Sequence, residues 1–163
     1  MTDEVLIASD HAGFALKQRL SALLRDRGLR VRDLGIEDGV SSDYADVAHP
    51  LARRISEGRA RRGVLLCGTG LGMSCVANRY RGVRAAVAWT PEIAELARRH
   101  NDANVLALPA RFVSDEEAMQ ILNAWLDTPF EGGRHQRRVA KIERVEETDG
   151  APARVPREAT ETR

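Results

Sequence analysis

Residues 67–72, CGTGLG, place a thiol directly before three glycines at alternate positions. A short apolar run, Val64–Leu66, precedes Cys67, and a stretch with helical character begins near Met73. Glycine backbones adopt positive φ and approach ligands closely, and amides beside a helix N-terminus bind anions. The segment therefore predicts a strand, a glycine loop and a helix that place a base or nucleophile beside a site for an oxyanion.

Other interpretations of this segment compete with that one. The GxGxG spacing differs from the GxGxxG of dinucleotide-binding folds, and no Lys follows as in a P-loop. A phosphatase of the Cys-x5-Arg type needs Arg at position 73, where this sequence has Met73. A cysteine at the end of a buried strand also often serves only as a small apolar side chain, and the loop alone leaves that interpretation open.

Two further pairs of polar residues stand at the ends of predicted elements. Asp10 and His11 follow the apolar run Val5–Ala8. They could orient sugar hydroxyls or bind phosphate, although an aspartate at a strand-to-helix corner often only caps the helix. His100 and Asn101 close a predicted helix, where a histidine suits the dipole and an asparagine tolerates the left-handed conformation. Structural roles therefore remain open for both pairs.

Arginines gather at the start of the last predicted helix. Arg134 and Arg138 lie four residues apart and share a helix face, with His135 and Arg137 between them. Cations at a helix N-terminus oppose the dipole, so this arrangement costs stability unless an anion lies nearby. The pattern favours a phosphate site over a solvated charged face. Arg111, after a predicted strand, is a further candidate for the same anion.

Apolar runs and amphipathic stretches alternate along the chain. Strands are expected at 5–8, 29–34, 64–66, 84–88 and 105–108, and helices at 14–27, 46–58, 73–79, 90–101, 114–126 and 134–147. This alternation predicts an α/β fold, a three-layer α/β/α sandwich with a five-stranded parallel Rossmann-like sheet. Ligands in such folds bind beyond the carboxyl ends of the strands, so Asp10 and Cys67 meet if their strands are neighbours.

Local signals predict several helix ends. Thr90 before Pro91 is a typical start, and Ser114 with Glu117 forms a capping box. Asp46 is the expected N-cap of the second long helix, which would leave Pro50 near the first turn, where a missing amide is tolerated.

Composition limits the classes of function. The chain has 163 residues, of which 43% are apolar and 30% charged, with a net charge of +1. These values are ordinary for a globular protein and give no general attraction to nucleic acid or membranes, and only 4% of residues are aromatic. Residues 1–147 are expected to form one domain, and 148–163 a disordered tail.

The two cysteines, Cys67 and Cys75, fit neither a disulfide framework nor a zinc spacing. Both are expected to be free thiols, with Cys75 a packing residue. No signal peptide or membrane span is recognised, so we expect a cytoplasmic protein.

Five motifs, in the same order, resemble type B ribose-5-phosphate isomerase of the ribose/galactose isomerase family. They are SDHAGFALK (9–17), CGTGLGMS (67–74), ANRYRGVRAAVA (77–88), RRHNDANVLALPAR (98–111) and EGGRHQRRV (131–139). The resemblance runs from about Val5 to Glu147. It implies an aldose–ketose interconversion through an enediolate, with no metal or other cofactor.

The resemblance also implies a role for each candidate residue. Cys67 would be the base that moves a proton between C1 and C2, His100 the acid that opens the furanose ring, and Thr69 the third catalytic residue. Another branch of the family has Gly at position 67 and Glu at position 73, and this sequence has the cysteine form at both positions. The residues implied in substrate binding are Asp10, His11, Tyr44, Gly68, Thr69, Gly70, Leu71, Gly72, Asn101, Arg111, Arg134 and Arg138.

Four questions stay open at this level. Ala45 stands where the family usually has Pro, which bears on the placement of Tyr44. The expected substrates are ribose 5-phosphate and ribulose 5-phosphate, with allose 6-phosphate, galactose 6-phosphate or a tetrose phosphate as alternatives. A non-catalytic sugar-phosphate sensor is a different class, which the set Cys67, Thr69 and His100 disfavours. The resemblance implies a homodimer or tetramer whose pockets are shared between chains.

Overall fold

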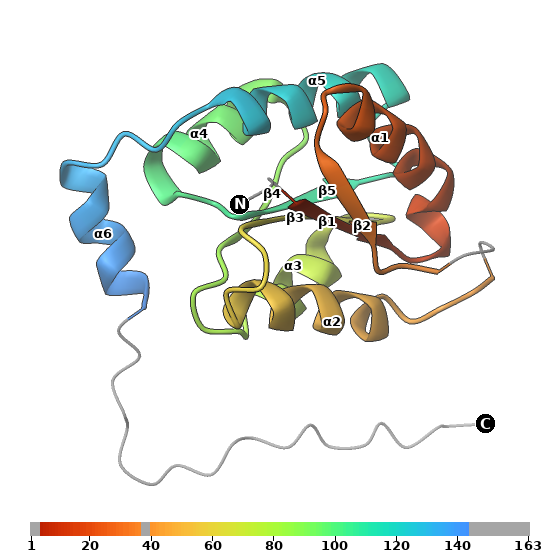
Figure 1. The fold of residues 1–163 in the computed structure, drawn as a ribbon, viewed down its shortest axis with the longest axis horizontal. Coiled ribbons are helices and arrows are strands. Elements are labelled where there is room, and N and C mark those ends of the chain that lie inside the picture. Colours follow the sequence, from red (N-terminus) through yellow and green to blue (C-terminus); the bar gives the residue numbers. More distant parts are fainter. Residues whose placement is uncertain (1–3, 37–39, 144–163) are drawn as a thin grey trace, which may run out of the picture.

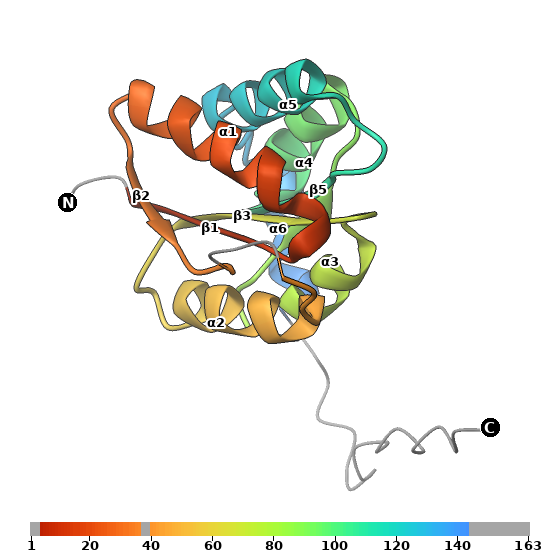
Figure 2. The ribbon, with the colours of Figure 1, turned by 90° about the vertical axis from the view of Figure 1, so that its right-hand side faces the viewer.

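The computed structural model describes residues 4–36 and 40–143, which fold into a parallel sheet with helices on both faces (Figures 1 and 2). The strands are β1 (Glu4–Ser9), β2 (Arg30–Asp33), β3 (Arg62–Cys67), β4 (Ala85–Val87) and β5 (Val105–Pro109). Their order is β2-β1-β3-β5-β4, and each neighbouring pair is parallel. The predicted α/β fold with a five-stranded parallel sheet is confirmed.

The helices form the two outer layers. They are η1 (His11–Gly13), α1 (Phe14–Asp26), α2 (Tyr44–Ser56), α3 (Leu71–Ala77), α4 (Pro91–Asn101), α5 (Asp115–Asp127) and α6 (Arg134–Ile142). Helices α1, α4 and α5 cover one face of the sheet, and α2 and α3 cover the other (Figure 2). Helix α6 lies at the side of the molecule, next to α4 (Figure 1).

Side chains of each strand alternate between two apolar cores, as the pleat requires. On β3, Val64 and Leu66 pack with α1 and α5, while Leu65 and Cys67 pack toward α2 and α3. All four are buried. Cys67 thus faces the α2 and α3 side of the sheet and ends the central strand.

Two predicted helix starts are confirmed and a third is wrong. The Thr90 hydroxyl accepts a hydrogen bond from the Ile93 amide, and Ser114 with Glu117 forms the capping box. Helix α2 begins at Tyr44 with Asp43 in the N-cap position, so Asp46 lies in the first turn instead of capping the helix. The carboxylate still lies near the positive end of the dipole, which explains the misleading signal.

The N-cap lies three residues earlier than predicted, so Pro50 lies inside α2 and beyond its first turn. The expectation that it lies near the first turn is therefore wrong. Pro50 is exposed, so water can hydrogen-bond to the carbonyl that the missing amide would have paired. Helix α3 also begins two residues earlier than predicted, because Gly70 at φ 74° turns the chain directly into it.

Asn78 closes the outer edge of β4. Its side-chain carbonyl accepts a hydrogen bond from the Ala85 amide (2.7 Å), and its NH₂ group donates to the Ala85 carbonyl (2.9 Å). One side chain thus takes the place of a neighbouring strand. The opposite edge, β2, carries the exposed charged residues Arg30, Arg32 and Asp33.

Two expectations fall on residues that the structure does not describe. The last helix is predicted to reach Glu147, and it is described as far as Ile142, followed by Glu143. The predicted tail, 148–163, lies wholly outside the described residues. Within the described ranges, every helix is too short or too polar to cross a membrane.

Candidate active site

The carboxyl ends of β1 and β3 lie side by side, as the predicted site requires. Ser9 pairs with Leu66, and the Asp10 amide donates to the Leu66 carbonyl (3.2 Å). The Asp10 carboxylate caps η1 by accepting hydrogen bonds from the amides of Ala12 (2.9 Å) and Gly13 (3.3 Å) through one oxygen, Oδ1. The capping role is therefore confirmed, and it holds the buried carboxylate next to the end of β3.

The glycine loop folds back over the thiol. The Gly70 amide donates to Cys67 Sγ at 3.1 Å, and the thiol is only 4% exposed. Thr69 is exposed, and its hydroxyl accepts a hydrogen bond from the Leu71 amide (3.3 Å). The loop therefore directs one backbone amide, that of Gly70, at the sulfur, an arrangement able to stabilise negative charge.

Two of the glycines have close side-chain neighbours. A Cβ on Gly72 would lie 2.6 Å from the Tyr44 ring, and a Cβ on Gly68 would lie 3.2 Å from Arg111 Cδ. The Arg111 amide also donates to the Gly68 carbonyl (3.1 Å). Tyr44 and Arg111 therefore pack against the loop that follows Cys67.

His11 joins the same edge of the sheet. It is exposed, and its Nδ1 accepts a hydrogen bond from the Ser42 amide (3.4 Å), just before α2. We name this group the carboxyl-edge cluster: Asp10, His11, Tyr44, Cys67, residues 68–72 and Arg111.

The remaining predicted residues gather elsewhere. The rings of His100 and His135 stack with centroids 4.2 Å apart and planes 6° apart. Arg134 Nε donates to His135 Nε2 (3.3 Å), and Glu131 lies 3.6 Å from the same nitrogen. Burial, followed by the neighbouring charges of His100 and Arg134, lowers the pKa of His135, so this ring is neutral and can accept the hydrogen bond.

Arg138 lies one turn after Arg134 on α6 and, like it, is exposed. Among the described residues, Arg138 makes no ion pair. We name this second group the amino-edge cluster: His100, Asn101, Arg134, His135 and Arg138.

The two clusters lie at opposite ends of the strands. Asn104 follows the end of α4, and its carbonyl accepts from the Gly63 amide at the amino end of β3. Gly63 pairs with Val105, and Cys67 pairs with Pro109 four residues later. At about 3.3 Å per residue, the two ends are roughly 13 Å apart. One chain therefore does not bring His100 together with Cys67, nor Arg134 and Arg138 together with Arg111.

One group of side chains in this region contains residue types that bind metal ions. The possible ligand atoms of His100, Glu131 and His135 lie within 4.8 Å of one another. A metal needs lone pairs that converge on one point, and the lone pairs of stacked, parallel imidazoles do not converge. The Arg134 guanidinium also occupies His135 Nε2. The group has the right residue types for a metal without the geometry.

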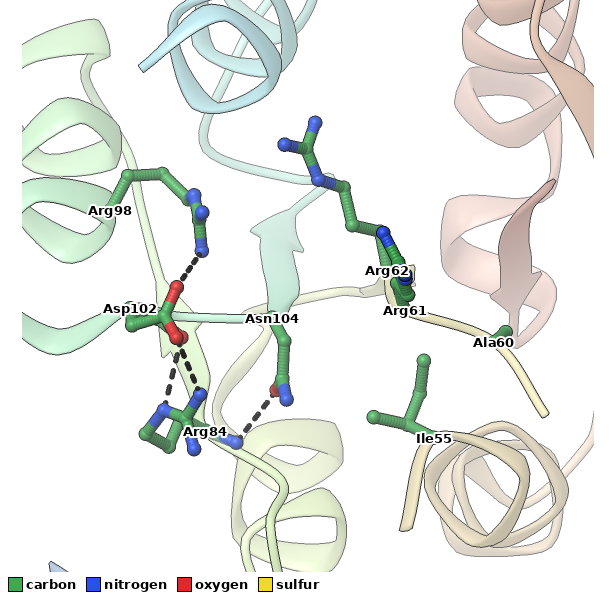
Figure 3. Close-up of a pocket in the computed structure, with 8 residues that line it drawn as sticks. All are labelled: Ile55, Ala60, Arg61, Arg62, Arg84, Arg98, Asp102 and Asn104. Carbon is green, nitrogen blue, oxygen red and sulfur yellow. Dashed lines mark hydrogen bonds and ion pairs between the residues drawn. The ribbon is translucent and has the colours of Figure 1, made fainter. Parts of the chain in front are cut away.

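A pocket of about 370 Å³ also opens at the amino ends of the strands (Figure 3). It contains no predicted site residue, and its lining is Ile55, Ala60, Arg61, Arg62, Arg84, Arg98, Asp102 and Asn104. Arg84 and Arg98 both bind the Asp102 carboxylate (2.9 and 2.8 Å), so these two cations already have an anionic partner. Sequence reasoning missed this network, in which only the i,i+4 pair of Arg98 and Asp102 is local in the sequence.

Cys75 differs from its expected role. It lies on α3 and is exposed, so the prediction that it packs in the core is wrong. Helix α3 turns this position away from the sheet, while Met73 and Ala77 face inward and are buried.

Comparisons with known proteins place the chain in a family. A family model described as Ribose/Galactose Isomerase matches residues 5–142. Ribose-5-phosphate isomerase B of Escherichia coli is 42% identical over 144 residues, which cover 88% of this chain and 97% of that protein. D-erythrulose-4-phosphate isomerase of Pectobacterium atrosepticum is 43% identical over 139 residues, 85% and 91% of the two chains.

Solved structures agree with this result. Ribose 5-phosphate isomerase from Thermotoga maritima gives a TM-score of 0.85 at 48% identity, covering 89% of this chain and 100% of that one. Ribose-5-phosphate isomerase B from Mycoplasma genitalium, with bound ribulose-5-phosphate, gives a TM-score of 0.83 at 42% identity, covering 86% of this chain and 93% of that one. The chain therefore belongs to the ribose/galactose isomerase family, and it is an aldose–ketose isomerase that acts on sugar phosphates.

Proposed function

We propose that this enzyme interconverts ribose 5-phosphate and ribulose 5-phosphate through an enediolate, with Cys67 as the base. The observation that carries the proposal is the placement of the Cys67 sulfur at the end of β3, under the Gly70 amide and inside the glycine loop. The names of several relatives support the choice of substrate.

The reaction needs a proton to move between two carbons. Cys67, as the thiolate, takes the proton from C2 of the open-chain aldose, and the electron pair moves to the carbonyl oxygen on C1. Amides of residues 68–72 stabilise the negative charge that develops there, and such stabilisation usually contributes more to the rate than any other single effect. The thiol then returns the proton to C1, while the Thr69 hydroxyl accepts the proton of the C2 hydroxyl and donates its own to the oxygen on C1, so that the carbonyl forms at C2.

A complete site needs groups from the other end of the sheet. Ring opening requires an acid and the phosphate requires cations, and these roles belong to His100, Arg134 and Arg138 in the amino-edge cluster. Because one chain keeps them about a strand length from Cys67, they come from a second copy in a homodimer. His11, Asp10 and Asn101 then hold the sugar, with Arg111 a further contact for the phosphate.

Exposed apolar side chains support association at the carboxyl edge. Tyr44, Leu71, Trp89 and Phe112 are 45%, 59%, 56% and 72% exposed, and all follow or border the carboxyl ends of strands. Contiguous exposed apolar side chains are typical of surfaces that become buried on association.

The test is a panel of aldose phosphates compared by kcat/KM, with the Cys67→Ala variant as background. Ribose 5-phosphate should give the highest value, because several relatives are named for this substrate or hold its ketose product. A higher value for allose 6-phosphate, galactose 6-phosphate or a tetrose phosphate would reassign the substrate. Binding without turnover for every sugar would instead indicate a sensor.

A further inference from the structure

One arginine touches both helix ends that carry the amino-edge cluster. Arg84, just before β4, binds the end of α4 and the end of α6. Resting on the function proposed above, we propose that Arg84 is a positioning residue, which fixes the ring-opening His100 relative to the phosphate-binding Arg134 and Arg138.

The contact with α4 is made through three hydrogen bonds. Arg84 Nε donates to the carbonyls of Asn101 and Asp102, both at 3.0 Å, and Nη2 donates to the Asp102 carboxylate at 2.9 Å (Figure 3). The last carbonyls of a helix lack partners within it, and a cation suits that end of the dipole. Arg84 therefore holds the turn that directly follows His100.

This turn has an unusual backbone. Among the described residues, Asp102 is the only non-glycine residue with positive φ (45°). Such a conformation persists only where the surroundings hold it, and here Arg84 and Arg98 grip the two carboxylate oxygens separately. The end of α4, which carries His100 and Asn101, is thus held by side-chain bonds.

The contact with α6 is made through Glu143. Arg84 Nη1 binds one oxygen of the Glu143 carboxylate at 3.1 Å, and the Gly82 amide donates to the other at 3.1 Å. Within α6 itself, only His135 and Val139 are buried. The position of the C-terminal end of α6 therefore depends on Glu143, and that of its N-terminal end on the stack of His135 against His100.

The geometry requires an arginine. Arg84 is 16% exposed, and its planar fork meets two carboxylates and two carbonyls at once. A lysine ammonium carries the same charge but cannot span these partners from one fixed plane. Since small displacements of catalytic groups cost about a hundredfold in rate in sensitive cases, loosening this fork should be measurable.

The experiment uses the full-length enzyme with ribose 5-phosphate, and inorganic phosphate as the inhibitor. Arg84→Lys should lower kcat/KM by at least about tenfold and also weaken inhibition by phosphate. Asp102→Gly, which keeps positive φ without strain, removes the carboxylate that Arg84 and Arg98 share and leaves the bonds from Arg84 Nε to the two carbonyls. It should lower kcat with phosphate inhibition unchanged. Glu143→Ala should raise KM and weaken phosphate inhibition with kcat nearly unchanged.

The different expected changes in kcat, KM and phosphate inhibition distinguish a positioning role of Arg84 from a role in the stability of the fold. A merely structural role would lower the active fraction of each variant, so kcat would fall with melting temperature while KM and phosphate inhibition stayed fixed. That result would overturn the proposal, as would wild-type kinetics in Arg84→Lys. Arg32→Lys, an exposed arginine on β2, is the matched control and should behave as wild type. If Arg84→Lys fails to fold, Asp102→Gly and Glu143→Ala carry the test.

Failure of this proposal is distinguishable from failure of the proposed function. If Cys67→Ala is inactive while Arg84→Lys is unchanged, only the positioning role is wrong. If Cys67→Ala retains wild-type turnover, the assignment of the base is wrong whatever Arg84 does.

Discussion

The carboxyl-edge and amino-edge clusters are built in different ways. Around Cys67 the parts are short: backbone amides, glycines and a carboxylate that caps η1. Around His100 the parts are long charged side chains that hold one another, through Arg84, Asp102 and Glu143. The first cluster follows from the path of the main chain, whereas the second depends on ion pairs between helix ends. The proposed proton transfer thus takes place where the main chain positions the groups, and the proposed ring opening where ion pairs position them.

The largest effect should come from a change in the carboxyl-edge cluster. Cys67→Ala should lower kcat by at least about a hundredfold, the low end for loss of a general base, with an unchanged fold. Steady-state kinetics and circular dichroism check this. Cys75→Ala is the matched control because Cys75 is the other free thiol, exposed on α3, and it should remain active. A comparable loss in that variant would mean that the wrong thiol was assigned.

The next effect tests whether the two clusters belong to different chains. Cys67→Ala and His100→Asn should each be nearly inactive alone. Subunit exchange in an equal mixture should restore about a quarter of wild-type activity, since half the dimers are mixed and each holds one intact site. No recovery, despite exchange verified by mass spectrometry, would place both groups in one chain.

A smaller effect is expected at the phosphate grip. Arg138→Ala should raise KM by about tenfold or more, because a hydrogen bond between charged groups contributes roughly 1.5–3 kcal/mol. Inhibition by inorganic phosphate should weaken in parallel. Arg137→Ala, an exposed neighbour on α6, serves as the control. Equal effects in both variants would indicate general charge instead of a specific contact.

The smallest effect concerns the pH dependence of stability. Burial and the neighbouring cations lower the pKa of His135 below its usual 6.5, so the unfolded chain takes up a proton before the folded protein does. The contribution of His135 to stability is therefore fully present above pH 6.5 and is lost as the pH falls below it. Melting temperatures at about pH 7.5 and about pH 5.5, on either side of the usual histidine pKa, should differ less in His135→Gln than in wild type. An equal difference would show that other groups determine the pH dependence.

Sequence reasoning predicted the centre of the carboxyl-edge cluster because the residues that form it are contiguous in the sequence. The apolar run before Cys67 and the glycines after it are contiguous, and so are β1 and Asp10. The capping signals at Thr90 and Ser114 were equally local. The start of α2 was misplaced because Asp43 and Asp46 give similar signals three residues apart.

The amino-edge network was beyond such reasoning. Arg84 lies just before β4, Asp102 just after α4 and Glu143 just after α6. Only the packing of the folded chain brings the three residues together. The distance between His100 and Cys67 has a topological origin. A helix that returns between parallel strands ends at the amino edge, opposite the glycine loop.

The Asn78 side chain that closes β4 restricts how two copies can meet. An open strand edge is a template for another chain, and proteins that must avoid this block it or charge it. Here Asn78 occupies the hydrogen-bonding groups of Ala85, and Arg30, Arg32 and Asp33 charge the other edge. A continuous sheet through two chains is therefore disfavoured, and polymerisation through strand addition is disfavoured with it. In the homodimer proposed above, the two chains would then meet through loops and helix ends, the parts of the chain that carry both halves of the proposed site.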